Sequence, residues 1–140
     1  SLDHMVQITT TPSGATLILD NNPELTCTTP CAVPMKEGRH TVMARLQGYR
    51  EALKIFNVPQ DSYVVIGMEM LAGTLVIRTV PEGASIYIDG KLQNQVTPAV
   101  LRLPAGKRRL RLVKNGLPAQ NDEVEIRDGA IKNYEYSWGR

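Results

Sequence analysis

The segment VPEGASIYID at residues 80–89 has a counterpart in the same chain, TPSGATLILD at residues 11–20. The two segments start 69 residues apart and keep proline, glycine, alanine and the final aspartate at matching places. Each closes with an alternation of apolar and polar residues that is typical of a short β-strand. Self-similarity at a fixed spacing marks a repeated structural unit, so we expect two copies of one unit in this chain of 140 residues.

The match continues beyond these segments at an offset of 68 residues. The difference from 69 means that one loop differs in length by one residue between the two copies. The match relates Thr29-Pro30 to Thr97-Pro98, Gly38 to Gly106, and Gly48 to Gly116. We therefore predict two domains, residues 5–71 and residues 72–140, with almost no linker between them. Residues 1–4 are interpreted as the remnant of an expression tag. The net charge of +2 gives no strong field that favours nucleic acid or an acidic membrane.

Short strands are expected throughout both copies. In the second copy they cover residues 73–79, 84–89, 99–103, 107–113, 122–127 and 131–138. Leu110 and Leu112 alternate with Arg109 and Arg111, which gives one apolar and one polar face. No window has a helical period. The prediction is an all-β chain of two tandem, small antiparallel β-sandwich units.

Proline and glycine set the first turn of each copy for physical reasons. Pro81 fixes its own φ and biases the preceding residue toward extended geometry. Gly83 permits a positive φ that other residues resist. Pro12 and Gly14 hold the same places in the first copy. We expect this turn to link the first two strands of each copy.

At these positions the chain resembles the PEGA domain family. The family is named for the tetrapeptide that stands here at Pro81, Glu82, Gly83 and Ala84. The first copy departs from it, because Ser13 takes the place of the glutamate. The resemblance implies a small β-sandwich, often in tandem, outside a bacterial or archaeal membrane, including in the ectodomains of Ser/Thr kinases. It implies no catalytic residues. A surface-layer or sugar-binding role has been suggested for the family.

Cys27 and Cys31 are the two cysteines of the chain. A disulfide between them requires that Thr29-Pro30 turns and brings the Cα atoms within about 7 Å. Such a bond fits an oxidising compartment, and two reduced thiols are the alternative. A zinc ion needs two further ligands, so no metal site and no cofactor are predicted.

The strongest charge feature is a basic run in the second copy. It consists of Arg102, Lys107, Arg108, Arg109, Arg111 and Lys114. One interpretation is an anion-binding face for a phosphorylated or acidic envelope polymer, a lipid head group or nucleic acid. The alternative is a solvated face on which Glu123 and Glu125 lie opposite Arg109 and Arg111. Nucleic acid is not expected, since no aromatic residue is interleaved with the run.

Three aromatic residues near the end of the chain, Tyr134, Tyr136 and Trp138, alternate and so share one face of a strand. That face is either a contact patch for a sugar or peptide, or a surface that packs into the core or on the other copy. His40 and Glu82 have no partners in the sequence that would indicate catalysis, and we predict that the protein is not an enzyme.

The sequence therefore predicts a non-catalytic, extracytoplasmic interaction or sensing module of a larger bacterial envelope protein, with the ectodomain of a membrane Ser/Thr kinase as one context. The alternatives are a domain that binds glycan or another cell-envelope polymer, and a purely structural spacer. The expected partner is a protein or an envelope polymer in the periplasm or at the cell surface. Contact with the membrane is expected only through an anchoring segment of the parent protein.

Overall fold

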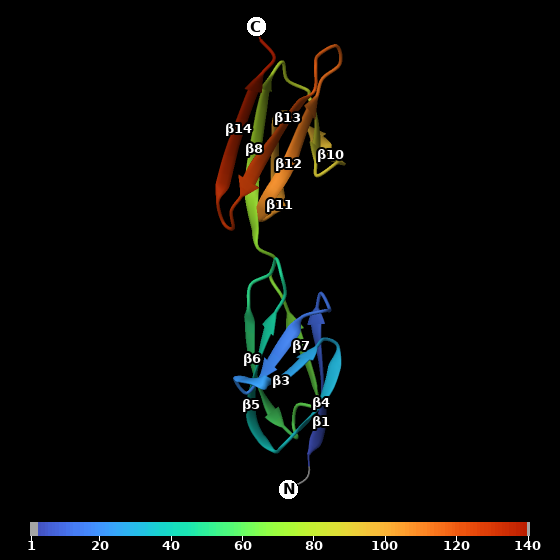
Figure 1. Cartoon of the computed structure of the whole chain (residues 1–140), viewed down its shortest axis with the longest axis vertical. Coiled ribbons are helices and arrows are strands. Elements are labelled where there is room, and N and C mark those ends of the chain that lie inside the picture. Colours follow the sequence, from blue (N-terminus) through green and yellow to red (C-terminus); the bar gives the residue numbers. More distant parts are fainter. Residues whose placement is uncertain (1–2, 140) are drawn as a thin grey trace. The chain divides into compact units, whose positions relative to one another are not determined.

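Figure 1 shows the computed structural model of the chain, which describes residues 3–139. The described residues form β-strands and no helix, so none of them belongs to a helix that could cross a membrane. The chain divides into two compact units, unit 1 (Ser1–Met70) and unit 2 (Leu71–Arg140). The prediction of an all-β chain with two tandem units is confirmed.

Unit 1 is built from two sheets. Its strands are β1 (His4–Thr11), β2 (Thr16–Leu19), β3 (Asn22–Thr28), β4 (Cys31–Met35), β5 (Gly38–Arg45), β6 (Ala52–Val58) and β7 (Tyr63–Gly67). One sheet has the strand order β4-β1-β7 and the other has the order β3-β2-β5-β6. Because β1 begins at His4, part of the segment interpreted as a tag remnant belongs to the first sheet.

Unit 2 repeats this arrangement. Its strands are β8 (Ala72–Val80), β9 (Ser85–Ile88), β10 (Lys91–Val96), β11 (Ala99–Pro104), β12 (Gly106–Val113), β13 (Gln120–Ile126) and β14 (Ile131–Ser137). The sheets have the orders β11-β8-β14 and β10-β9-β12-β13, so each strand corresponds to one in unit 1.

The structure differs from the sequence prediction in two respects. Strand β10 was not predicted, because it is a polar edge strand whose register shifts between Leu92 and Val96. In addition, the first and last strands of each unit pair in parallel, β1 with β7 and β8 with β14, while the other pairs are antiparallel. A period of two shows which residues share a face, but it does not show strand direction.

Each unit has a hydrophobic core of its own, formed by the inward residues of the alternating strands. The core of unit 1 includes Val6, Ile8, Leu17, Val42, Phe56 and Ile66. The core of unit 2 includes Leu75, Ile77, Ile86, Leu110, Leu112 and Ile126. Complete burial of such side chains stabilises a fold by about 1.5–3 kcal/mol each.

A pair of buried threonines holds the first turn of unit 2. The Thr79 hydroxyl donates to the carbonyl oxygen of Pro81 over 2.8 Å, and it lies 2.5 Å from the Thr97 hydroxyl. The Thr97 hydroxyl also accepts a hydrogen bond of 2.9 Å from the backbone N–H of Ala84. Because a hydroxyl has one proton and Thr79 uses its own toward Pro81, Thr97 is the donor between the two. A chain of hydrogen bonds thus runs from Ala84 through both threonines to Pro81.

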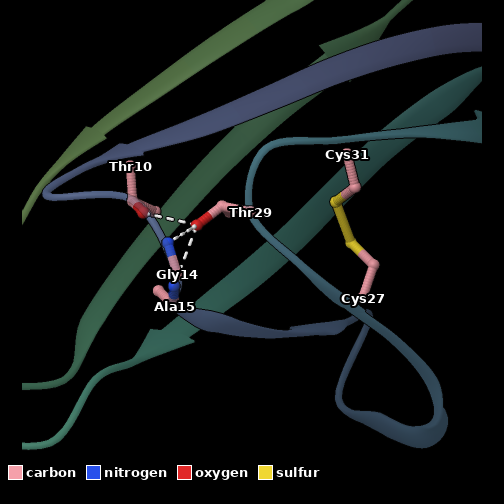
Figure 2. Close-up of a disulfide and its surroundings, with 6 residues drawn as sticks. All are labelled: Thr10, Gly14, Ala15, Cys27, Thr29 and Cys31. Atoms are coloured by element: carbon pink, nitrogen blue, oxygen red, sulfur yellow. Dashed lines mark hydrogen bonds between the residues drawn. A yellow bond between two sulfur atoms is a disulfide. The ribbon is translucent and has the colours of Figure 1, made fainter.

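Unit 1 contains the same threonine pair, drawn in Figure 2. The Thr10 hydroxyl donates to the carbonyl oxygen of Pro12 and lies 2.6 Å from the Thr29 hydroxyl. The backbone N–H groups of Gly14 and Ala15 both donate to that Thr29 hydroxyl, over 3.1 and 2.9 Å. The recurring Thr-Pro dipeptide is therefore explained by the threonine, which enters the interior and satisfies the amides of the turn.

The loop that carries this second threonine is fastened differently in the two units. In unit 1, Cys27 on β3 and Cys31 on β4 form a disulfide, with their Cα atoms 6.5 Å apart (Figure 2). In unit 2, Gln95 stands in the place of Cys27. Its amide donates to the carbonyl oxygen of Val100 over 3.2 Å and accepts from the N–H of Val100 over 3.4 Å. Two hydrogen bonds between β10 and β11 thus stand where unit 1 has a covalent bond.

The threonine chain can be tested with Thr97→Val, which keeps the shape of the side chain and removes the hydroxyl. We expect the free energy of unfolding of unit 2 to fall by about 1–3 kcal/mol, because the N–H of Ala84 then stays buried without an acceptor. Urea denaturation measures the change, and Thr97→Ser is the control that keeps the hydroxyl. Equal stability of the valine and serine variants would contradict this role.

Replacement of both cysteines, Cys27→Ser with Cys31→Ser, should lower the free energy of unfolding of unit 1 by about 2 kcal/mol, because the bond closes only a short loop. The bond itself is checked by intact mass after alkylation, with and without reductant. Alkylation of the unreduced protein at both thiols would show that the disulfide is absent.

Candidate functional site

Arg108, one of the predicted binding residues, has a structural role in unit 2. Its guanidinium donates to the Asp89 carboxylate over 3.0 Å and to the carbonyl oxygen of Ala105 over 2.8 Å. The other carboxylate oxygen of Asp89 accepts from the N–H of Arg109 over 2.8 Å. This backbone hydrogen bond is the largest cause that lowers the pKa of Asp89 below its ordinary value. Arg108 therefore ties two turns together, and its prediction as a ligand contact is not supported.

The other basic residues of β12 point outward from the sheet β10-β9-β12-β13. Lys107, Arg109 and Arg111 alternate with the inward-facing Leu110 and Leu112. Their cross-strand partners on β13 are Glu125 for Lys107, Glu123 for Arg109 and Asn121 for Arg111. An acid thus lies opposite Arg109 in the register, without an ion pair between the two among the described residues, whereas Arg111 faces an amide because the register lies two residues from the expected one.

Arg111 lies at the centre of a row that crosses this sheet. Tyr87 on β9 is its partner on one side, and Leu92 on β10 lies beyond Tyr87. On the other side is Asn121 on β13. Arg111 forms no ion pair with any described residue, so its charge is available to a ligand.

An open depression of about 750 Å³ lies on this face. We define the arginine face by five of the residues that line it: Tyr87, Arg109, Arg111, Asn121 and Glu123. It presents two guanidinium groups, an amide, a phenol and the Glu123 carboxylate. Guanidinium and amide groups bind a carboxylate or phosphate, and the tyrosine ring also offers a flat surface. The described residues contain no cluster of His, Cys, Asp or Glu suited to a metal ion.

The comparisons with known proteins agree with this architecture. A family model, described as the PEGA domain, matches residues 4–70 and residues 72–137. The chain belongs to the PEGA domain family. The resemblance seen at residues 81–84 is thereby confirmed for both copies, and the matched ranges lie within the two structural units.

Two solved structures resemble the tandem PEGA domains. "The Bacillus anthracis TIE protein" has a TM-score of 0.60 at 17% identity, covering 96% of this chain and 34% of that chain. This chain thus spans about a third of that protein, and the likeness shows the fold alone. GBS52, "the minor pilin in gram-positive pathogen Streptococcus agalactiae", has a TM-score of 0.42 at 10% identity, covering 96% of this chain and 94% of that chain. No curated protein matches the chain.

The basic residues that were predicted as one binding face do not all lie on the same face of unit 2. Arg102 lies on β11 with its side chain outward, and β11 belongs to the other sheet of the sandwich. The arginine face therefore excludes Arg102 as well as Arg108. Sequence reasoning grouped them because they are neighbours along the chain, but strand alternation and the change of sheet separate them.

The three aromatic residues that were predicted as a contact patch make most of their contacts within unit 2. Tyr134, Tyr136 and Trp138 are half-buried and pack against the core of unit 2. The Tyr134 hydroxyl donates to Asp122 over 2.9 Å, and the indole N–H of Trp138 donates to the carbonyl oxygen of Pro118 over 2.7 Å. Of the two interpretations, the structure favours core packing.

The corresponding face of unit 1 is apolar, a feature that was not predicted from the sequence. The residues Ile18, Met43, Leu53 and Ile55 occupy the places of Tyr87, Arg111, Asn121 and Glu123. Leu53 is 65% exposed and Ile55 is 48% exposed. Comparison of the two copies, strand by strand, would have shown this difference. The two PEGA units thus share a fold and differ in the chemistry of one face.

The structural role of Arg108 can be tested with Arg108→Met, which keeps much of the aliphatic side chain and removes the charge. We expect the free energy of unfolding of unit 2 to fall on the order of 1.5–3 kcal/mol, since hydrogen bonds to the Asp89 carboxylate and the Ala105 carbonyl are lost. Arg109→Met is the matched control on the outward face and should change stability by about 0.5 kcal/mol or less. Thermal unfolding measures both, and equal effects would refute the distinction.

Proposed function

We propose that this tandem PEGA chain is a non-catalytic interaction module of a larger bacterial envelope protein, and that its arginine face contacts an anionic partner. The observation that carries the proposal is Arg111, an outward cation with no ion pair among the described residues, set between a tyrosine and an asparagine.

The partner chemistry follows from the neighbours of Arg111. The guanidinium and the Asn121 amide together donate several hydrogen bonds, which fit the oxygens of a carboxylate or phosphate. Glu123 lies opposite Arg109 in the strand register, and no ion pair joins the two among the described residues. The face therefore combines two arginines with one glutamate, and an anionic group would be attracted to the arginines. A protein with acidic side chains and an acidic envelope polymer both offer such groups.

An extracytoplasmic location is part of the proposal. The disulfide between Cys27 and Cys31 supports it, because disulfides persist in the periplasm and at cell surfaces and are rare in the cytosol. The family resemblance adds the ectodomain of a membrane-anchored Ser/Thr kinase as one context in which such a module would sense or hold a partner.

A structural spacer is the second candidate. It is supported by two self-contained units of one topology, whose family matches end at residue 70 and resume at residue 72. A spacer depends on the number of units and tolerates changes on the arginine face, so the same variants separate the two functions.

We expect the full chain to be retained by cell-envelope material isolated from the source bacterium, and Arg111→Glu, alone or with Arg109→Glu, to reduce retention at least several-fold. The reason is that the reversed charge repels an anionic partner. Pull-down followed by quantitation measures retention, and protease treatment of the envelope material distinguishes a protein partner from a polymer.

Arg102→Glu is the matched control, because it makes the same change of charge on the other sheet and should leave retention unchanged. Equal losses for Arg102→Glu and Arg111→Glu would show that net charge and not the arginine face is responsible. No retention of the unaltered chain, together with a parent function that depends on unit number, would favour the spacer.

A further inference from the structure

His40 takes the place in unit 1 that Arg108 takes in unit 2. Its Nδ1 lies 2.7 Å from a carboxylate oxygen of Asp20, and its Nε2 lies 2.7 Å from the carbonyl oxygen of Lys36. Asp20 corresponds to Asp89, and its other oxygen accepts from the N–H of Thr41 over 3.0 Å. Both units therefore contain one clamp, in which a side chain on the fifth strand joins an aspartate to the carbonyl of the preceding turn.

The two clamps differ in how they depend on protons. A neutral imidazole has one N–H, so it donates to one of the two oxygens and turns a lone pair toward the other. An imidazolium donates to both. The guanidinium of Arg108 keeps its donors at every physiological pH. Since the His40 side chain is only 13% exposed, water does not readily replace a missing donor there.

We propose that protonation of His40 closes the clamp of unit 1, so that unit 1 loosens as the surroundings change from mildly acidic to mildly alkaline while unit 2 does not respond. This is a property of unit 1 and is independent of binding at the arginine face of unit 2.

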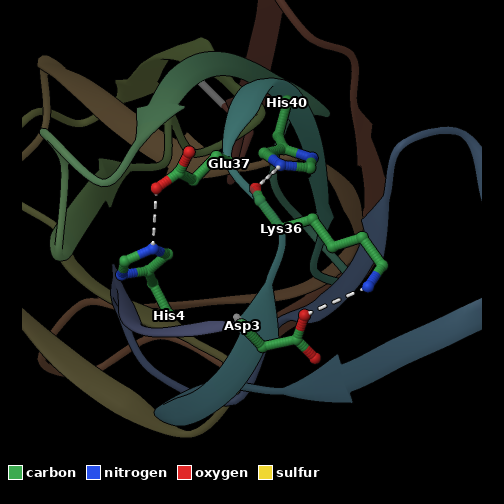
Figure 3. A network of polar contacts seen from close by, with 5 residues as sticks. All are labelled: Asp3, His4, Lys36, Glu37 and His40. Carbon is green, nitrogen blue, oxygen red and sulfur yellow. Dashed lines mark hydrogen bonds and ion pairs between the residues drawn. The ribbon is translucent and has the colours of Figure 1, made fainter. Parts of the chain in front are cut away.

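The surroundings of His40 contain one charged contact. From the end of β2, Asp20 faces the ring, and from β6 the ring of Phe56 stacks against it at 5.6 Å. The preceding turn offers the carbonyl of Lys36. As Figure 3 shows, the Lys36 ammonium reaches away to Asp3 at 3.4 Å, and Glu37 lies with His4 at 3.3 Å. The Lys36 charge is therefore paired with Asp3, Glu37 contacts His4 and not His40, and among the described residues Asp20 is the charged group in contact with the His40 ring.

The direction of the effect follows from the same contacts. Burial is the largest single influence on the pKa of His40 and lowers it, but the Lys36 carbonyl and the Asp20 carboxylate together raise the pKa above its ordinary value of 6.5. A raised pKa in the folded state stabilises the fold below the unfolded pKa of about 6.5 and ceases to do so as the pH rises through the folded value. The pKa of Asp89 is lowered, so the clamp in unit 2 weakens only in acid.

The test uses the full chain and two NMR measurements between about pH 5 and about pH 8.5, a range that brackets histidine titration. The first is the titration of the His40 ring, which should have its midpoint above the ordinary histidine value. The second is hydrogen exchange, corrected for the intrinsic rate, at the N–H groups of Thr41 and Arg109. Protection should fall at Thr41 across the His40 titration and stay constant at Arg109.

Substitution of the residue of each clamp by the residue of the other provides matched variants. His40→Arg should make protection at Thr41 independent of pH, and Arg108→His should bring the same loss of protection to Arg109. The proposal is overturned if His40 titrates at or below its ordinary value, or if protection at Thr41 does not follow its titration. If a variant does not fold, the two measurements on the unaltered chain still decide.

Discussion

The hydrogen-bond chain through two buried threonines is the constraint on which each unit depends. Thr79 and Thr97, like Thr10 and Thr29, join two connections inside the sandwich, each of which passes from one sheet of the unit to the other. Their hydroxyls satisfy amides that the Pro-x-Gly-Ala turn would otherwise leave buried without partners. The tetrapeptide that names the family gives the path of the turn, but the threonines fasten it. This explains why Ser13 can replace the glutamate while both threonine pairs remain.

The parts of the fold that follow from alternation were predictable. Leu110 and Leu112 are buried because their strand has one apolar face, and the same reasoning gave most strands of unit 2. The polar edge strand β10 has no such pattern, and the parallel direction of β14 depends on contacts between the ends of the unit. Buried threonines also escape a sequence argument, because threonine is common at the surface as well.

The candidate site was predictable only in part, since sequence neighbours are not neighbours in space. Arg109 and Arg111 lie together on the outward face, as alternation requires. Arg102 belongs to another sheet, and Arg108 forms an ion pair with Asp89. The comparison of the two copies is more informative than either copy alone. The core residues and the threonine pairs recur in both copies, whereas the outward residues of the corresponding sheets differ in chemistry.

The parallel pairing of the first and last strands has a mechanical consequence. In unit 1 the register runs from Gln7 opposite Tyr63 to Thr11 opposite Gly67, so β1 and β7 end on the same side of the sheet. The polypeptide therefore enters a unit at one pole and leaves at the other. Tension between the two ends of a unit acts along these strands and loads their hydrogen bonds in shear, all at once. Such a module resists stretching better than a hairpin, whose bonds would open one after another under the same pull.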